Sequence, residues 1–358
     1  MKDSQYDGFV YRGIWPPWID ENGNVSLFAF FTKKYLEEEF RKHGLRHNPV
    51  DIIVSTFLIS KALSNQPIDI WERVEDEFCY VIFGSNLIED VGAGFDYTVS
   101  LCGRVFRGEH VDITDTDRAE LLYDSEQGNQ EINRAAASRV RREIVQHARA
   151  LLWAINNIVI AGMPWSEDVI KTIHGILYTG IVNDVIVPGE YRGVDHPITA
   201  EYIDRETGEE RITRFIHPHV IPSRMAAWVR NLNTDISSAE SGSFFDGSFV
   251  DPYDLAAEHY RSFIDIHPFG VGNGLVSRII LNCLVMRFTG HMIPMGMDDE
   301  EKREFLGIAI GGAEKPQDHS EIAKLMARKS VEPLTRMWTW IKKHPQDLHP
   351  VFRSRLLN

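Results

Sequence analysis

A histidine, a proline and several glycines stand directly before a long apolar run in the segment IDIHPFGVGNGLVSRIILNCLV, which spans residues 264–285. Glycine permits backbone conformations that are closed to other residues. If a helix begins near Asn273, the backbone N–H groups of Gly272, Asn273 and Gly274 converge at its N-terminus, where the helix dipole favours an anion. His267 lies at the rim of this turn, in the position of a group that takes a proton from a nucleophile attacking the bound anion.

Arg278 lies one turn inside the apolar run LVSRIILNCLVMRF. A helix that is apolar nearly all round is buried, and a buried arginine requires an anionic partner. A phosphate or an internal carboxylate would serve. A His-Pro pair at a helix junction, a glycine-rich loop and a core arginine each have ordinary structural explanations, but here all three features indicate one small volume.

The elements that must hold this turn are mostly helical. Helices are predicted over residues 27–43, 49–63, 68–84 and 133–160, from the cap Ser166 onward, and over residues 222–235, 251–266 and 321–343. Between Gly180 and Ile221, Val, Ile and Thr alternate with charged residues, and DRETGEER (204–211) has the composition of a hairpin tip. The pattern predicts a mainly α fold with one β-hairpin.

Composition excludes several classes of protein. The chain has 358 residues, a formal net charge of −14 and three scattered cysteines. An acidic protein is a poor general binder of nucleic acid or anionic membranes, because phosphates attract basic surfaces. The cysteines, without metal-ligand spacing, are expected to be reduced core residues of a cytoplasmic protein. No apolar run is long enough to span a membrane.

The stretch HPFGVGNGLVSR resembles the signature of the Fic (Fido) family, His-Pro-Phe-x-Asp/Glu-Gly-Asn-Gly-Arg-x-x-Arg. Two further segments agree with this resemblance. Fic proteins have a β-hairpin flap that usually contains Gly-x-Tyr-Arg, and PGEYRGV supplies Gly189, Tyr191 and Arg192. Many members carry an inhibitory helix with Ser/Thr-x-x-x-Glu-Gly/Asn, and GSNLIEDVG supplies Ser85 and Glu89. The order of segments is similar to larger fungal Fic proteins with an N-terminal inhibitory helix.

The resemblance implies a Fic-type helical bundle with a flap, and a transfer of AMP from ATP to a hydroxyl of a target protein. It implies that His267 is the general base and that the Gly272-Asn273-Gly274 positions form the anion hole. Arg278 is expected to reach the γ-phosphate in active forms and to pair with Glu89 in resting forms. The flap is expected to align the target segment by strand-like pairing.

Two departures from the signature bear on the choice of donor. Val271 stands at the acidic position that holds Mg²⁺, and Mg²⁺ requires oxygen ligands. Leu275 stands at the first arginine position and forms no charge-assisted hydrogen bonds to phosphate. Because electrostatic stabilisation usually contributes most to the catalysis of phosphoryl transfer, we expect ordinary Mg²⁺-ATP chemistry to be impaired or lost.

Three functions fit this pattern. The first is a nucleotidyltransferase-like Fic enzyme with altered donor use, for which ATP stays one candidate donor and no metal ligand is assigned. The second is a repurposed enzyme in which His267 performs acid/base chemistry on a small molecule without a nucleotide. The third is a catalytically dead binding module. The Glu89–Arg278 pair is open to a regulatory or a purely structural role.

The resemblance also divides the chain. We expect an N-terminal helical extension over residues 1–80, a Fido domain over 80–300 and a helical closure over 301–358. The expected partners are a protein target or a small-molecule substrate at the flap, with no nucleic acid and no membrane. A homodimer is a further expectation, because many Fic proteins dimerise.

Overall fold

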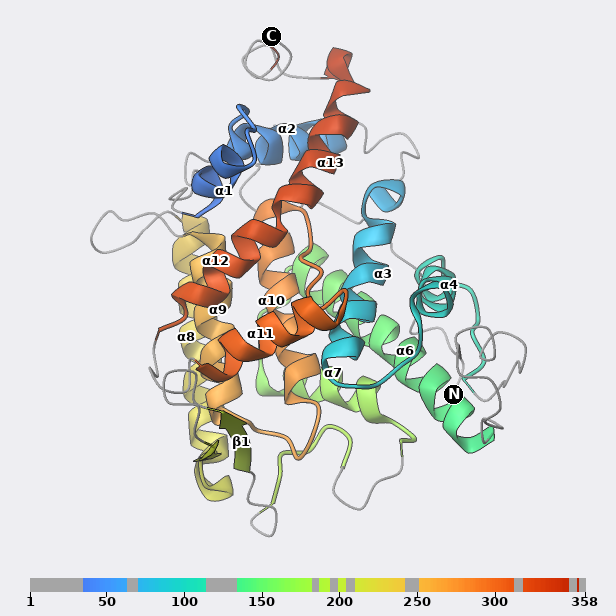
Figure 1. Cartoon of the computed structure of the whole chain (residues 1–358), viewed down its shortest axis with the longest axis vertical. Coiled ribbons are helices and arrows are strands. Elements are labelled where there is room, and N and C mark those ends of the chain that lie inside the picture. Colours follow the sequence, from blue (N-terminus) through green and yellow to red (C-terminus); the bar gives the residue numbers. More distant parts are fainter. Residues whose placement is uncertain are drawn as a thin grey trace.

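The computed structural model describes residues 35–62, 70–113, 134–181, 187–193, 199–203, 210–241, 251–311, 318–347 and 353. This part of the chain is mainly helical, as predicted (Figure 1). The aromatic-rich first residues, the acidic loop after residue 113 and the hairpin tip at 204–209 lie outside it.

Five α-helices come first in the described part of the chain. They are α1 (Leu36–Lys42), α2 (Pro49–Ala62), α3 (Ile70–Ile88), α4 (Phe95–Phe106) and α6 (Arg134–Ala154), and α6 continues as a π-helical turn, η2 (Ile155–Ile160). The helix α7 (Glu167–Tyr178) follows, and its predicted cap is present: Ser166 Oγ accepts a hydrogen bond from the Val169 N–H at 3.1 Å. This cap satisfies one of the donors that a helix start leaves unpaired.

The β-pattern lies between α7 and α8. Strand β1 (Thr199–Ile203) pairs antiparallel with β2 (Glu210–Arg214), with Thr199 opposite Arg214 and Ile203 opposite Glu210. The predicted tip ran to Arg211, whereas Glu210 and Arg211 belong to β2. A short 3₁₀ turn, η3 (Pro218–Val220), then leads into α8 (Ile221–Ser241).

The second half contains the helix pair that carries the motif. Helix α9 (Pro252–Ile266) begins one residue after its predicted start, and Asp251 caps it: Asp251 Oδ1 accepts from the Tyr253 N–H at 2.8 Å. Helix α10 (Asn273–Thr289) begins at Asn273, as predicted, and almost all of its side chains are buried. In Figure 1 it lies in the middle of the molecule, with α8 and α9 on one side and α6 and α7 on the other. Full burial of aliphatic side chains such as Ile279, Ile280 and Leu281, all 0% exposed, stabilises the fold by about 1.5–3 kcal/mol each.

The C-terminal prediction was wrong in one respect. A single helix was expected over residues 321–343, but the structure has α12 (Ser320–Lys329) and α13 (Val331–Lys342). Pro333 explains the break at Ser330, because its ring excludes the carbonyl of Lys329 and it has no N–H to donate. The break lets α12 pack on α9 while α13 packs on α2. A 3₁₀ turn, η5 (Pro345–Asp347), follows.

Helices α4 and α11 (Asp299–Gly311) were not predicted, and α3 was expected to stop at Gly84. Gly84 instead lies inside α3, where a side chain would collide with the chain beside it: a β-carbon there would lie 2.2 Å from the Met295 carbonyl oxygen. This glycine therefore serves close packing rather than helix termination.

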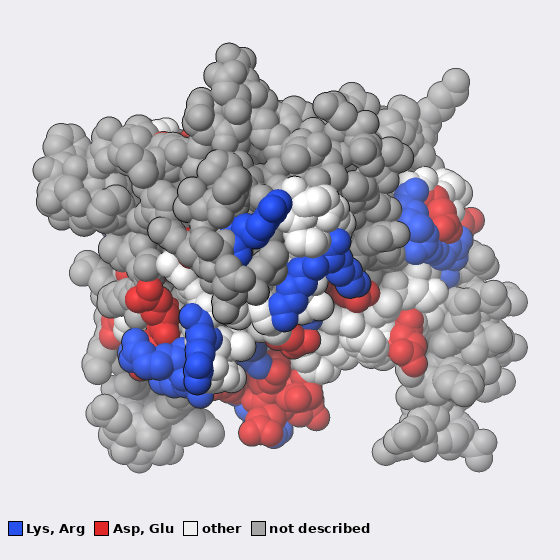
Figure 2. Space-filling view, turned by 90° about the horizontal axis from the view of Figure 1, so that it is seen from above, with Lys and Arg blue, Asp and Glu red and all other residues white. Residues whose placement is uncertain are grey.

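All three cysteines, Cys79, Cys102 and Cys283, are buried and free, as expected for core residues. Among the described helices, none has the length and apolarity needed to cross a bilayer. Figure 2 looks down on the end that carries α1, α2 and α13, and on the described part of this face basic and acidic side chains lie beside one another. Such neighbours include Lys42 with Glu38 at 3.1 Å and Arg336 with Glu332 at 2.6 Å.

Candidate active site

The motif loop, residues 267–272, joins α9 to α10 between two residues of left-handed backbone. His267 ends α9 with φ +50°, and Gly272 precedes α10 with φ +75°. A β-carbon at Gly272 would lie 2.3 Å from the Tyr178 ring, so this position requires glycine for conformation and for space. The N–H groups of the first turn of α10 have no acceptor within the helix, and the dipole makes them an anion site.

Asn273 keeps the motif loop closed with its own side chain. The Phe269 N–H donates to Asn273 Oδ1 at 2.9 Å, and Asn273 Nδ2 donates to the Phe269 carbonyl at 2.8 Å. The amide is therefore used within the loop. Asn273 has only its backbone N–H to offer an anion.

His174 on α7 is a part of the site that sequence reasoning missed. Its ring stacks on Phe269 with centroids 3.9 Å apart and planes 3° from parallel. The Gly189 N–H donates to His174 Nδ1 at 2.9 Å, so Nε2 carries the proton and donates to the Val271 carbonyl at 3.2 Å. Burial lowers the pKa of His174 to about 4, which keeps the ring neutral as this pairing requires. No local motif identifies His174, because its hydrogen-bond partner Val271 lies 97 residues further along the chain.

His267 is held as a neutral imidazole. Its pKa is lowered to about 4, mainly by burial and also by the nearby Arg192 cation, while the Ile264 carbonyl and Glu89 oppose the shift. Its ring stacks on Phe215, the residue directly after β2, with centroids 3.9 Å apart. A neutral imidazole at neutral pH is able to accept a proton.

Gly189, Tyr191 and Arg192 lie in the segment 187–193, before β1 and outside both strands. The sequence had placed them in the flap, but hydrogen bonds tie them to the motif loop and to α7. The Arg192 N–H donates to the Pro268 carbonyl at 2.9 Å, Nε to the His267 carbonyl at 2.7 Å and Nη2 to the Ile216 carbonyl at 2.6 Å. Tyr191 donates its hydroxyl to Glu167 Oε2 at 3.1 Å. This segment therefore supports the backbone of the motif loop.

The structure brings Ser85, Glu89 and Arg278 together. Arg278 is 3% exposed. Its Nε donates to Ser85 Oγ at 2.7 Å, and its Nη2 donates to the Ser85 carbonyl at 3.1 Å and to Glu89 Oε1 at 2.7 Å. A β-carbon at Gly274 would lie 2.1 Å from the same Glu89 oxygen. The carboxylate therefore rests against the first turn of α10, where a bound anion would lie.

The turn that carries Glu89 has a residue in left-handed backbone directly after it. Asp90 has φ +55° and forms an ion pair with Lys302 on α11. Asp and Asn tolerate this conformation better than other residues with side chains. The inhibitory-helix pattern of the Fic family has Gly or Asn at the position of Asp90. Asp90 therefore meets the same requirement for left-handed backbone as those residues do.

Val271 and Leu275 lie in the wall of a pocket beside the motif loop. This pocket, called the Val271 pocket below, has a volume of about 240 Å³. Its apolar wall comprises Val91, Leu177, Tyr178, Ile181, Val271 and Leu275. Asn86, Glu89, Gly272, Arg139 and Glu143 complete the lining, and His267 does not belong to it.

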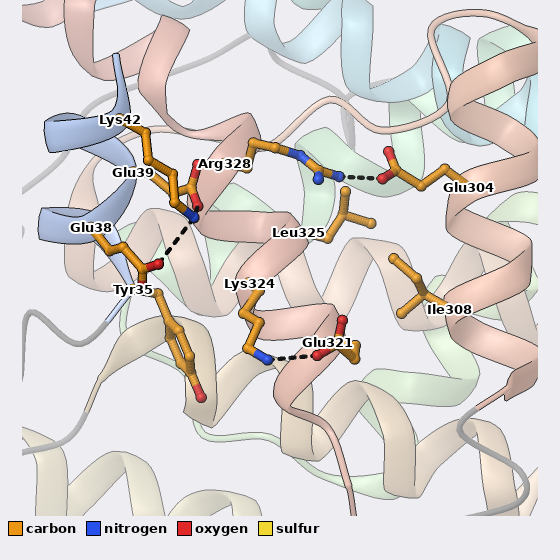
Figure 3. Close-up of a pocket in the computed structure, with 10 residues that line it drawn as sticks. All are labelled: Tyr35, Glu38, Glu39, Lys42, Glu304, Ile308, Glu321, Lys324, Leu325 and Arg328. Atoms are coloured by element: carbon orange, nitrogen blue, oxygen red, sulfur yellow. Dashed lines mark hydrogen bonds and ion pairs between the residues drawn. The ribbon is translucent and has the colours of Figure 1, made fainter. Parts of the chain in front are cut away.

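A second pocket, of about 370 Å³, lies between α1, α11 and α12 and away from the motif (Figure 3). Its cations are already paired with carboxylates: Lys42 with Glu39 at 2.8 Å, Lys324 with Glu321 at 2.6 Å and Arg328 with Glu304 at 2.5 Å. None of the predicted site residues lines it. It therefore offers no unpaired cation to an anionic ligand and is not the candidate site.

Comparison with known proteins identifies the part of the chain that contains this site. The sequence model of the Fic/DOC family matches residues 164–285, which run from the start of α7 to the middle of α10. Residues 164–285 are therefore a Fic/DOC domain. A Fido domain-containing protein of Dictyostelium discoideum is 28% identical over 117 residues, which are 32% of this chain and 76% of that protein.

Solved structures with Fic domains have the same fold. A Fic domain containing signaling protein from Bacteroides thetaiotaomicron matches with a TM-score of 0.50 and 20% identity, over 86% of this chain and 94% of that chain. Fic-1 from C. elegans matches with a TM-score of 0.51 and 15% identity, over 80% of this chain and 70% of that chain. At these identities the likeness supports the fold alone.

The residues of this Fic loop do not fit the Mg²⁺ ion that the family signature implies. The hydrocarbon side chain of Val271 stands at the acidic position, and its carbonyl is already bonded to His174. Within the described ranges, no group of three or more His, Cys, Asp and Glu side chains is placed to hold a metal ion. Mg²⁺ prefers several oxygen ligands in near-octahedral geometry, which this wall does not supply.

Proposed function

We propose that this Fic protein is a transferase that moves a phosphate-linked group onto a hydroxyl acceptor, as nucleotidyltransferases do, without the usual use of Mg²⁺-ATP. The observation that carries the proposal is the neutral His267 beside the uncapped first turn of α10, with the buried Arg278 one turn further along. These are a base, an anion site and a cation in one place. The family's frequent AMP transfer supports the same reaction class.

The proposed step uses only groups of this chain. The acceptor oxygen attacks phosphorus while its proton passes to the imidazole of His267, and the bond from phosphorus to the leaving group breaks. The N–H groups at the start of α10 and the Arg278 guanidinium stabilise charge on the phosphate oxygens. Fixed donors of this kind need little rearrangement as charge develops.

Glu89 defines the proposed resting state. Its carboxylate pairs with Arg278 at 2.7 Å and lies against Gly274. A phosphate and a carboxylate cannot share that position without strong repulsion. Donor binding therefore requires Glu89 to move away, which makes the pair a regulatory contact rather than only a structural one.

The proposed acceptor site is the β1–β2 hairpin. A two-stranded sheet leaves one edge of each strand free to pair with an extended peptide. Phe215 follows β2 directly and stacks on His267 at 3.9 Å, so a segment aligned on the hairpin is close to the proposed base. We propose a flexible, hydroxyl-bearing segment of a protein as the acceptor.

Transfer of labelled phosphate groups tests the proposal. The purified chain is incubated with ATP and other nucleoside triphosphates labelled at the α-phosphate, with nucleoside diphosphate esters and with phosphorus-labelled phenyl phosphate, and protein-bound label is counted. Glu89→Gly is expected to raise labelling at least tenfold, and His267→Ala in that background is expected to abolish it. Asp90→Gly, which keeps Glu89 and the backbone requirement, is the matched control and is expected to leave labelling low.

Two results would contradict the proposal. Absence of label from every donor in Glu89→Gly would exclude the transferase. Equal label with and without His267 would exclude its role as the base.

A further inference from the structure

The Val271 pocket adjoins the anion site directly. Gly272, whose left-handed turn starts α10, belongs to its lining, and so does Leu275 in the first turn of the helix. A ligand whose phosphate lies against the first turn of α10 therefore extends into this pocket. The chemistry of the pocket decides what can be attached to that phosphate.

About half of the pocket wall is hydrocarbon or aromatic, and the other half is polar. Leu177 is 3% exposed and Leu275 7% exposed, and the Tyr178 ring packs against Gly272. Burial and the carboxylates of Glu89 and Glu143 raise the pKa of the Tyr178 hydroxyl, so this residue stays neutral. The apolar half of the wall favours apolar groups and disfavours the highly hydrated oxygens of a polyphosphate.

The charged groups of the pocket are already paired. Glu89 bonds to Arg278 at 2.7 Å, and Glu143 bonds to Arg139 at 2.8 Å. The Gly92 N–H donates to the other oxygen of Glu143 at 3.3 Å. When Glu89 moves away, only Arg278 becomes available as a cation among the described residues of the site. One cation with backbone N–H groups suits one phosphate, whereas three phosphates would repel one another without further cations.

Asn86 adds a single polar feature to the wall. It is 2% exposed, and its Oδ1 is paired with His147 Nδ1 at 2.8 Å. Its Nδ2 is buried without a hydrogen-bond partner among the described residues. An unsatisfied buried donor costs free energy, which a ligand oxygen would recover.

We propose that the Val271 pocket binds the uncharged, mainly apolar part of a ligand that carries a single phosphate group at the start of α10. The inference rests on the proposed function, because it names the class of donor for the same site. The volume is adequate: a cavity of roughly 150 Å³ accepts benzene in another protein, and this pocket measures about 240 Å³. The donor is then a phosphate ester with a small apolar or aromatic group in place of further phosphates. The acceptor oxygen bonds to phosphorus as the phosphorus–oxygen bond to that group breaks, and the group leaves as its alcohol or phenol with the proton that His267 took from the acceptor.

Binding measurements in the Glu89→Gly background test this inference without any transfer step. The probes are inorganic phosphate, phenyl phosphate and ATP with Mg²⁺, each followed by isothermal titration calorimetry. Burial of a phenyl ring is expected to make phenyl phosphate bind roughly tenfold or more tightly than inorganic phosphate. ATP with Mg²⁺ is expected to bind more weakly than phenyl phosphate.

Variants of the pocket wall then test whether the wall causes the preference for phenyl phosphate over inorganic phosphate. Val271→Asn is expected to reduce the ratio of phenyl phosphate to inorganic phosphate affinity at least fivefold, and Leu275→Asn is a second variant in the first turn of α10. Val187→Asn makes the same kind of change on a residue that is 63% exposed and outside the pocket, and it is expected to leave the ratio unchanged. Circular dichroism melting checks that each variant is folded.

The outcomes separate this inference from the proposed function. Equal binding of the two phosphates, no binding of either, or a ratio that survives both pocket variants would overturn the pocket assignment, while labelling could still support a transferase. A clear preference for phenyl phosphate together with no labelling from any donor would keep the pocket and remove the transferase.

Discussion

His174 shows how one buried side chain can hold the motif loop without taking part in chemistry. Its two ring nitrogens link Gly189 and Val271, which belong to segments that approach α7 from different parts of the chain. The stack on Phe269 adds an aromatic contact to these bonds. The loop geometry at His267 therefore depends on a residue of α7.

Substitution of His174 by Phe separates the two contributions. The new ring keeps the stack on Phe269 but leaves the Gly189 N–H and the Val271 carbonyl without partners. We expect the free energy of unfolding to fall by about 1–3 kcal/mol, because these backbone groups are partly buried. Urea unfolding measures the change. His217→Phe, at an exposed position, is the control and is expected to stay within about 0.5 kcal/mol; equal losses in the two variants would contradict the role of His174.

The sequence indicated the residues of the motif by their own types and spacing, whereas the distant residues were named only through the resemblance or were missed. His267, Gly272 and Arg278 lie within a dozen residues, so their types and spacing alone predicted an anion site with a buried cation. Glu89 was predicted as the partner of Arg278 only through the resemblance to Fic proteins, and it lies 189 residues away. His174 and Asn86 had no local signal, because their partners are brought to them only by helix packing.

At the scale of elements, the segment 187–193 links α7, the end of α9 and the residues that follow the hairpin. Arg192 bonds through its side chain to the His267 carbonyl in the motif loop and to the Ile216 carbonyl just after β2. Its cation also lowers the pKa of His267. The hydrogen bonds that Arg192 makes and the effect of its charge on the pKa of His267 can therefore be tested separately.

Two substitutions at Arg192 make this separation. Arg192→Lys keeps the charge but loses the planar fork that serves two carbonyls, and Arg192→Met loses both. Each is expected to lower the free energy of unfolding by about 1–3 kcal/mol. NMR titration of the His267 imidazole is expected to show a higher pKa in Arg192→Met than in Arg192→Lys. A pKa that is the same in both variants would show that the charge of residue 192 does not act on His267.

Helix boundaries were predicted where local chemistry sets them and missed where packing sets them. The caps at Ser166 and Asp251 follow from the side chains at those positions, and the start of α10 follows from the left-handed backbone of Gly272. A glycine is typical of a helix end, yet α3 continues through Gly84, because the Met295 backbone packs against it. The break at Ser330 depends on Pro333, whose effect on the preceding turn was available in the sequence but outweighed by the apolar pattern.

At the scale of the whole molecule, three histidines around the motif, whose pKa values are strongly lowered, make stability depend on pH. The pKa values of His147, His174 and His267 are lowered to about 3, about 4 and about 4, in each case mainly by burial. Their pKa in the unfolded chain is close to 6.5. Between these values the unfolded chain binds protons that the folded protein does not, so stability is full above about pH 6.5 and falls as the pH drops towards 4.

The three histidines lie on three elements around the motif: His147 on α6 bonds to Asn86 of α3, His174 lies on α7 and His267 ends α9. Acidification from about pH 7 to about pH 5 is therefore expected to cost about 1–2 kcal/mol for each histidine, a large share of the usual stability of a domain. Urea unfolding at the two pH values measures the loss, and most carboxylates titrate below this range.

His147→Gln retains an amide that can bond to Asn86 and removes one titrating group, so it is expected to reduce the loss by about a third. If the three imidazoles titrated normally in the folded protein, they would contribute nothing to this loss, and His147→Gln would lose as much stability as the unchanged protein.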